Sequence, residues 1–369
     1  MSNKLSYSKV SSYNLCGERY RLSYVEGLQA KQARASLSFG GAFDKAGNVL
    51  LETRDLAKAL VEFDKQWNFQ WVNGKYIALK SYADIVYADA DFDADLVTLT
   101  EEQEAWIKQF KIDKKSKKWF EIDEEARSKY NSFCWESLRA KGVILLTSYH
   151  DKVLPKLYDI KAIQYKHEVT NDSGDTIIQY LDFVATTAEH SVIIFDNKTT
   201  SSLDYYEDDS AANSPQLISY YYTTKDLFKL DGVGFIAISK QIIKNKTKTC
   251  PSCGFNGNES KARTCDNEIQ GTVVKRGKES PGLVRCGAEW EVTMNPEAAI
   301  KIIVNSVSDK AADLVMDSFD VANRAIKAGI YPKNLSACKN IFGAPCEFQK
   351  VCWAGDKSEV VAKPERKDQ

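Results

Sequence analysis

Three side chains in the middle of the chain have the types and spacing that metal-assisted phosphodiester hydrolysis requires. Asp182 lies near the middle of an expected strand, Asp196 ends the next apolar run, and Lys198 follows two residues later. Residues i and i+2 of an extended segment project from the same face, so Asp196 and Lys198 are expected to point together. Carboxylates on adjacent strands repel each other unless a cation lies between them, and oxygen ligands suit Mg²⁺ or Mn²⁺. A lysine beside such an ion can orient the attacking water and offset negative charge that develops on a phosphate.

The Asp-x-Lys tripeptide is a weak signal on its own, because a surface ion pair at a strand end has the same residues. The order of its surroundings strengthens the prediction. An Asp-containing strand, a turn and the Asp-x-Lys strand are followed by a helix that carries Gln216 and Tyr220 on one face. Ser214 as N-cap and Pro215 at the first helical position predict where this helix begins. Glu168 is a candidate acid for the same cleft, although an exposed strand position explains it better.

Four of the nine cysteines lie close together in sequence and predict a zinc site. Cys250-Pro-Ser-Cys253 is a C-x2-C knuckle, and Cys265 and Cys286 follow after 11 and 20 intervening residues. Four thiolates on a loop-rich stretch that has no core of its own suit a closed tetrahedral Zn²⁺ site. The second pair is not C-x2-C, so the ribbon is irregular, and a chance cluster of surface thiols is the alternative.

A second group of cysteines lies near the C-terminus. Cys338, Cys346 and Cys352 are separated by 7 and 5 residues, and three thiolates leave a four-coordinate site one ligand short. Cys134 lies in an apolar helical context and is expected to be a buried structural thiol, which leaves Cys16 as the candidate fourth ligand. One metal centre would then hold the two ends of the chain together. An iron–sulfur cluster is the expected occupant, with a second Zn²⁺ as the alternative.

The elements that must position these residues follow from periodicity and turn signals. Three runs rich in Val, Ile, Phe and Tyr, with turn residues between them, predict a meander of strands over 160–169, 176–186 and 191–196. A further strand is expected over 232–239, directly before the cysteine knuckle. Residues 308–329 predict an amphipathic helix.

Length and composition exclude several classes of protein. The chain has 369 residues with 43 % apolar and 27 % charged residues, which is ordinary for a globular protein and unlike disordered, collagen-like or coiled-coil chains. The net charge of -1 excludes nucleic-acid binding through bulk basicity, but not through a local basic channel. Without an apolar run of ~18 residues or a secretory signal, we expect a protein of the bacterial or phage-infected cytoplasm, with no membrane partner. Thiols stay reduced there, which favours metal ligands over disulfides.

Together these residues resemble the RecB-type branch of the PD-(D/E)XK nuclease superfamily, and in particular its iron–sulfur members. Those include the CRISPR adaptation nuclease, the AddB nuclease domain and related phage exonucleases. The family's order of motifs is found here as Cys16, Gly40-Gly-Ala-Phe-Asp44, Asp182, Asp196-Asn-Lys198, Gln216-Leu-Ile-Ser-Tyr220, and Cys338, Cys346 and Cys352. Two features depart from the family: Asp44 stands where the family has His, and the first gap between the C-terminal cysteines is seven residues rather than two.

The resemblance implies a Mg²⁺- or Mn²⁺-dependent deoxyribonuclease, in particular an exonuclease acting on DNA ends in recombination, repair or phage DNA processing. Asp182 and Asp196 would hold the catalytic metal, with Asp44 as an additional ligand, and Lys198 would orient or activate the attacking water. Gln216 would contact DNA or brace the site.

Tyr220 would share that role with Gln216. The cluster cysteines Cys16, Cys338, Cys346 and Cys352 would hold a 4Fe-4S centre with a structural role. The alternative function is a non-catalytic DNA-binding or assembly subunit that uses the zinc module and a nuclease-like scaffold. A homo-oligomer or a recombination or replication partner is also compatible with the sequence.

The implied fold is α/β, with a restriction-endonuclease-like central mixed sheet flanked by helices, a helical insertion, a zinc-ribbon-like insertion and a C-terminal iron–sulfur helical segment. The expected segments are an N-terminal helix with one cluster cysteine (1–36), a mainly helical region (37–155), the nuclease core (156–245), the zinc-binding insertion (246–290), a C-terminal helical segment (291–358) and a disordered tail (359–369). The insertion would grip nucleic acid or a partner, or form a lid, since its surroundings are rich in lysine: Lys240, Lys244, Lys246, Lys248, Lys261, Lys275 and Lys278.

Overall fold

The computed structural model of the chain describes most of its length. The described residues are 4–30, 32–67, 69–72, 75–78, 84–86, 96–116, 122–171, 174–241, 246–262, 264–275, 277–294, 296–339 and 345–363. Of the lysines around the predicted zinc insertion, Lys244 lies outside them, as do residues 364–369 of the expected tail.

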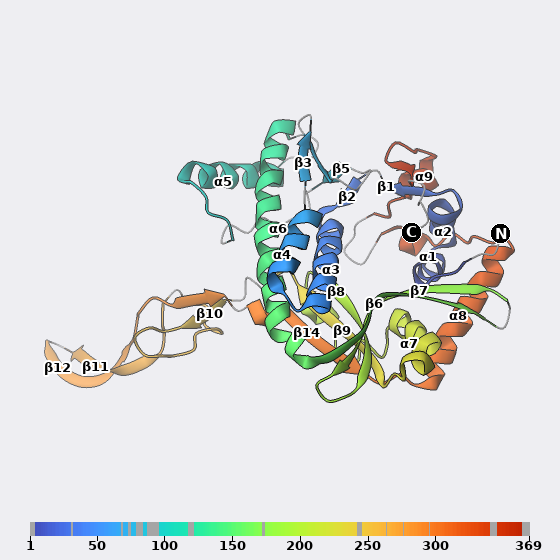
Figure 1. The fold of residues 1–369 in the computed structure, drawn as a ribbon. Coiled ribbons are helices and arrows are strands. Elements are labelled where there is room, and N and C mark those ends of the chain that lie inside the picture. Colours follow the sequence, from blue (N-terminus) through green and yellow to red (C-terminus); the bar gives the residue numbers. More distant parts are fainter. Residues whose placement is uncertain are drawn as a thin grey trace.

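A five-stranded mixed sheet forms the centre of the molecule, in the order β14-β9-β8-β7-β6 (Figure 1). The strands are β6 (Leu157–Thr170), β7 (Thr176–Thr187), β8 (Val192–Thr200), β9 (Gly232–Ser239) and β14 (Ile300–Asn305). The first three form the predicted antiparallel meander, β9 runs parallel to β8, and β14 is antiparallel to β9. All eight residues of β9 are buried, as expected for a strand covered on both faces. The predicted α/β fold with a central mixed sheet is confirmed.

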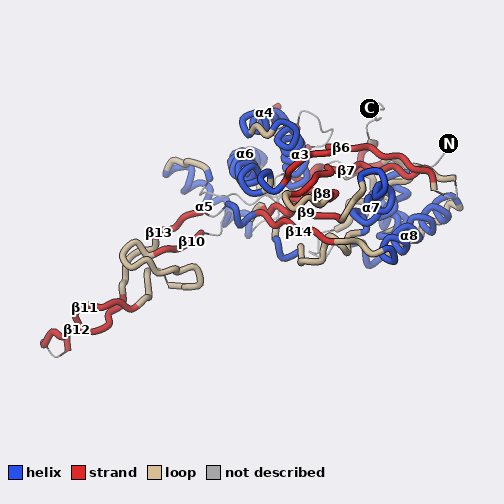
Figure 2. The backbone as a smooth tube through the Cα atoms, turned by 60° about the horizontal axis from the view of Figure 1, so that its bottom comes forward, coloured by secondary structure: helices blue, strands red, loops and turns tan. Residues whose placement is uncertain are grey.

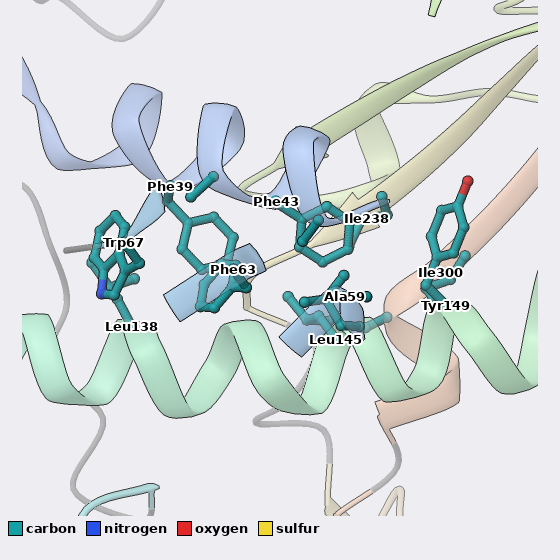
Figure 3. Close-up of a cluster of buried hydrophobic side chains, with 14 of the residues drawn as sticks. Phe39, Phe43, Ala59, Phe63, Trp67, Leu138, Leu145, Tyr149, Ile238 and Ile300 are labelled. Carbon is teal, nitrogen blue, oxygen red and sulfur yellow. The ribbon is translucent and has the colours of Figure 1, made fainter. Parts of the chain in front are cut away.

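Helices cover both faces of this sheet (Figure 2). On one face lie α3 (Ala35–Thr53), α4 (Leu56–Gln66) and α6 (Glu124–Lys152), and their core includes the aromatic side chains Phe39, Phe43, Phe63, Trp67 and Tyr149 (Figure 3). On the other face α7 (Pro215–Phe228) buries Leu217 and Tyr220 against the sheet. The helix α8 (Asp309–Lys327) packs beside α7 and α1 (Tyr7–Leu15), and its N-cap is Ser308, as its pattern predicts.

The N-terminal segment differs from the single helix expected over residues 1–36. After α1, Cys16 is extended, with φ -165° and ψ 115°, and the chain continues as α2 (Gly17–Tyr20) and a π-helical turn, Arg21–Val25. The end of this N-terminal segment contains two short strands, β1 (Leu28–Ala30) and β2 (Gln32–Arg34). These strands pair with segments far along the chain, so local sequence carries no signal for them.

The other segments differ from expectation in smaller ways. The mainly helical region contains α5 (Glu101–Ser116) and also β3 (Phe69–Val72), β4 (Lys75–Ala78) and β5 (Asp84–Val86), which join β2 in a four-stranded sheet. Residues 291–358 begin with two strands before α8 and α9 (Gln349–Ala354). The expected disordered tail includes β15 (Val360–Ala362), which is ordered because it pairs with β1.

The predicted zinc insertion forms two antiparallel pairs that project from the body (Figures 1 and 2). The inner pair is β10 (Lys246–Thr249) with β13 (Glu291–Met294), and the outer pair is the hairpin of β11 (Glu268–Lys275) and β12 (Lys278–Arg285). The insertion therefore extends through Met294 rather than ending at residue 290.

Candidate active site

The central sheet splits into a fork between β7 and β8. The last paired residues of these two strands are Phe183 and Phe195, whose rings stack at a centroid distance of 5.2 Å. Beyond them β7 remains paired with β6, and β8 remains paired with β9. The next residues are Asp182 and Asp196, so the two carboxylates lie where the strands diverge. The backbone N–H of Asn197 donates to Asp182 Oδ2 at 3.0 Å, and the Asp182 side chain thereby takes a place that a paired strand would otherwise fill.

Lys198 lies on the same face of β8 as Asp196, as the i, i+2 spacing predicts. Its Nζ lies 2.6 Å from Asp196 Oδ2, and it donates to Gln216 Oε1 at 3.2 Å. Asp196 Oδ2 is buried, and the Lys198 ammonium is the group that offsets its charge. The strand continues to Thr200, so Asp196 lies inside β8 and does not end it as expected.

Gln216 and Tyr220 approach the fork from the first turns of α7. Ser214 caps this helix by accepting from the Leu217 N–H, and Pro215 occupies its first turn, as predicted. Gln216 Nε2 lies 3.3 Å from Asp196 Oδ1 and 2.9 Å from Tyr220 Oη. The Gln216 amide therefore contacts both charged groups of the Asp-x-Lys motif and is itself positioned by the tyrosine.

Burial in the fork disfavours the charged forms of Asp182 and Asp196. It raises the pKa of Asp196 to about 7, against the effect of Lys198 and together with that of Asp182. Burial also raises the pKa of Asp182. Two buried carboxylates in contact fit a hard divalent cation, because a cation would offset the charge that burial disfavours.

Asp44 lies at the edge of the fork on α3. Burial and the neighbouring Asp182 raise its pKa to about 6. The oxygens of Asp44, Asp182 and Asp196 do not all come within 4.8 Å of one another. Asp44 is thus close enough for the charge of Asp182 to raise its pKa. The carboxylates of Asp44, Asp182 and Asp196 nevertheless do not form one compact set of ligands.

The structure adds residues that the sequence did not indicate. Gln164 lies on β6 beside Asp182, with Nε2 3.5 Å from both carboxylate oxygens of Asp44 and a left-handed backbone, φ 48°. Tyr149 donates to Asn197 Oδ1 at 3.1 Å from the opposite side of the sheet. Gln164 lies in an ordinary strand pattern, so no local signal marks it.

Glu168, the candidate acid on β6, has an ion-pair partner on the same strand. It is exposed and pairs with Lys166 at 2.8 Å, as its exposed-strand interpretation predicts.

The four clustered cysteines of the insertion come together. Their sulfur atoms lie within 4.8 Å of one another, with 3.5 Å between Cys250 and Cys286 and 3.6 Å between Cys253 and Cys265. A tetrahedral Zn²⁺ with Zn–S bonds near 2.3 Å would place its sulfurs about 3.8 Å apart. The donor set therefore fits a single tetrahedral ion.

The other four cysteines bring the two ends of the chain together. The pKa of the Cys352 thiol is raised by burial. The nearby acidic groups Glu18, Cys346 and Cys16 raise it further, so these cysteines lie near one another. The backbone N–H of Cys346 donates to the Cys338 carbonyl at 2.8 Å. Unlike the sulfurs of the insertion, these four do not form a group within 4.8 Å of one another. Cys134 is fully buried in the α6 core, as expected.

Comparison with known proteins agrees with this geometry. A family model described as the PD-(D/E)XK nuclease superfamily matches residues 4–352. A search of curated proteins found no match. None of the described helices combines the length and apolar character needed to cross a membrane.

Proposed function

Because the chain belongs to the PD-(D/E)XK nuclease superfamily, we propose that it is a metal-dependent deoxyribonuclease of the RecB-type branch that hydrolyses phosphodiester bonds at DNA ends. The observation that carries this proposal is the fork in the central sheet, where Asp182, Asp196 and Lys198 meet. Loss of any one of the three would suggest a degenerate site, and all three are present.

Asp182 and Asp196 would hold a Mg²⁺ or Mn²⁺ ion, and Asp44 would approach it from α3. When bound, the ion would polarise the scissile phosphate and lower the pKa of a water. Lys198, held by Asp196 and Gln216, would orient the attacking water and offset the negative charge that develops on the phosphate.

Gln216 and Tyr220 would position these groups. The Gln216 amide contacts both Asp196 and Lys198, so it holds the lysine ammonium in one orientation while the carboxylate binds metal. Catalysis depends steeply on such positioning, since a misplacement of about 1 Å can cost on the order of 100-fold in rate.

Two further metal centres would have structural roles. Cys250, Cys253, Cys265 and Cys286 would hold Zn²⁺, and the wider set of Cys16, Cys338, Cys346 and Cys352 would hold an iron–sulfur cluster. Hydrolysis needs no electron transfer, and each centre would connect segments that are separate in sequence. Exonuclease action in recombination, repair or phage DNA processing follows from the resemblance to the RecB-type branch.

The test is incubation of the full-length protein with labelled linear single- and double-stranded DNA and with closed circular DNA, in the presence of Mg²⁺ or Mn²⁺. We expect the linear substrates to be degraded from their ends and the circle to survive. Lys198→Ala should abolish cutting, whereas Lys65→Ala, on the exposed side of α4, should not.

Cutting of the circle would contradict the exonuclease proposal while leaving the nuclease proposal intact. If no substrate is cut but DNA is bound, the protein is a DNA-binding or assembly subunit built on a nuclease scaffold. Equal cutting by the wild type and Lys198→Ala would remove Lys198 from the mechanism.

A further inference from the structure

The hairpin of β11 and β12 stands apart from the rest of the molecule. The two strands pair along their full length, from Glu268 opposite Arg285 to Lys275 opposite Lys278, and among the described strands none joins them. Both backbone views show the hairpin extending outward from the inner pair, β10 and β13 (Figures 1 and 2). An isolated two-stranded hairpin is marginally stable in water, so something must hold it in this extended position.

The four-thiolate group provides that support at the base of the hairpin. Cys265 lies just before β11, and Cys286 directly follows β12, so one candidate ligand flanks each strand at the base of the hairpin. The strand pairing continues into the group, because Cys286 N–H donates to Asn267 O at 2.9 Å and Gly287 N–H donates to Cys265 O at 2.9 Å. A bound ion would therefore fasten both ends of the hairpin to the Cys250 knuckle.

The two strands of the hairpin also pack against each other. Gly271 and Gly282 lie opposite each other, and a Cβ on Gly271 would lie 2.3 Å from Val284 Cγ2. A Cβ on Gly282 would lie 2.7 Å from Val273 Cγ2. The two valine side chains thus cover the glycine pair.

The tip of the hairpin carries concentrated positive charge. Lys275 and Lys278 are exposed and directly opposite each other, with Arg276 and Gly277 between them in sequence. Like charges directly opposite each other on paired strands are destabilising. The whole chain has a net charge of -1, so this basic tip is a local exception that a polyanion would stabilise.

We propose that the β11–β12 hairpin is an arm that binds the sugar-phosphate backbone of duplex DNA through Lys275 and Lys278, away from the catalytic fork. This inference rests on the proposed function, because it assigns the arm to the same DNA substrate. A two-stranded ribbon has dimensions that fit a DNA groove, and two exposed lysines at its tip are suited to phosphates. The zinc group sets the direction of the arm, and the arm extends the contact between protein and substrate.

The test compares DNA binding by the full-length protein and its variants. Fluorescence anisotropy would follow a labelled duplex of about 40 bp, roughly four helical turns, with Ca²⁺ in place of Mg²⁺ to suppress cutting. For Lys275→Ala/Lys278→Ala we expect Kd to rise roughly tenfold or more at low salt, and the slope of log K against log salt to fall by about 2. Lys275→Arg/Lys278→Arg should bind as the wild type does.

Two controls accompany the tip variant. The first tests whether any loss of surface lysines has the same effect, and the second tests whether the fork is still intact. Lys58→Ala/Lys65→Ala removes two lysines on α4 whose side chains are each 66 % exposed, and it should leave Kd and the salt slope unchanged. Hydrolysis of bis(p-nitrophenyl) phosphate, a substrate too small to reach the arm, should be the same in the tip variant and the wild type. Zinc content should also be unchanged, which would show that the base of the arm is intact.

An unchanged Kd and salt slope in the tip variant would overturn the proposal. Loss of a dimer in light scattering with DNA affinity unchanged would also overturn it and would assign the arm to a second copy of the chain. If the wild type hydrolyses neither DNA nor the small phosphodiester while the tip variant still loses DNA affinity, the nuclease function fails and the arm proposal stands.

Discussion

At the scale of single residues, Asp196 shows the conflict between folding and catalysis most clearly. Its side chain is 1 % exposed, and burial raises its pKa from 3.8 to about 7. Burial disfavours the charged form, yet a metal ligand must be charged at neutral pH. The fork therefore stores an unfavourable charge that metal binding offsets.

Asp196→Asn should stabilise the metal-free protein at alkaline pH. An acid whose folded-state pKa is raised binds its proton more tightly in the folded state, so its stability contribution is present at low pH and is lost as pH rises from about 4 toward 7. The neutral amide removes this loss, and we expect a gain of roughly 1–3 kcal/mol at pH 8 that shrinks toward pH 4. Urea unfolding without added divalent metal, at both pH values, measures it.

Mg²⁺ should reverse the order of stability, because it binds the folded wild type and not the variant. Asp159→Asn, on the exposed part of β6, is the matched control and should change neither value. A wild type that is more stable than Asp196→Asn at pH 8 without metal would contradict this account of the site.

At the scale of elements, the packing of α4 against α6 supports the helical layer behind the fork. Gly142 on α6 faces Phe63 on α4, and a Cβ there would lie 2.1 Å from Phe63 Cζ. Phe63 is fully buried between α3 and α6 (Figure 3). The two helices approach this closely because position 142 has no side chain, and α6 in turn places Tyr149 on Asn197 in the fork.

Gly142→Ala should destabilise the protein although alanine is the better helix former. Helix propensity would favour alanine by about 1 kcal/mol, but the clash with a buried ring forces Phe63 or α6 to move at a cost of roughly 1–3 kcal/mol or more. Gly41→Ala provides the comparison, because that position is exposed on α3 with open space around its Cβ. Thermal unfolding of both variants should give a lower Tm for Gly142→Ala and an unchanged or higher Tm for Gly41→Ala. The opposite ranking would show that the helices tolerate the added methyl group.

At the scale of the whole molecule, the N-terminal and C-terminal segments pack against each other. A Cβ on Gly17 would lie 2.6 Å from Pro332 Cδ, so the segments around residues 17 and 332 are in close contact. Tyr13 donates to the Ile330 carbonyl at 2.9 Å, and β1 pairs with β15. The cysteines of the proposed cluster lie within this contact region, so a cluster would join segments that are already adjacent.

Cys352→Ser should remove the iron–sulfur chromophore that we expect in protein purified without oxygen. Because the cluster would connect Cys16 to the C-terminal segment, its loss should also make α1 more accessible to protease, while the central sheet stays folded. Visible absorbance, iron content and limited proteolysis measure these effects. Cys134→Ala is the matched control and should keep the colour, since Cys134 is buried in the α6 core. A colourless wild type that contains zinc but no iron would contradict the cluster.

The amino-acid sequence by itself determined the local features of the site. Apolar runs separated by turn residues predicted the three-stranded meander, Ser214 and Pro215 predicted the start of α7, and the i, i+2 spacing placed Asp196 and Lys198 on one face. Each of these features depends only on residues close together in the chain. Helix caps and periodic patterns can therefore be recognised in a single sequence. The grouping of Cys250, Cys253, Cys265 and Cys286 was also predictable, because a C-x2-C knuckle and two further cysteines supply the four thiolates of a tetrahedral site.

Only the tertiary structure decided where these pieces meet. The split of the sheet beyond Phe183 and Phe195, the left-handed Gln164 beside Asp182 and the contact between Gly17 and Pro332 all join residues from different elements. The β11–β12 arm likewise begins at a group of four cysteines that come from different segments, two of which flank the hairpin. Such contacts are selected by packing and charge balance over the whole chain, and no local pattern records which of the many compatible arrangements has the lowest free energy.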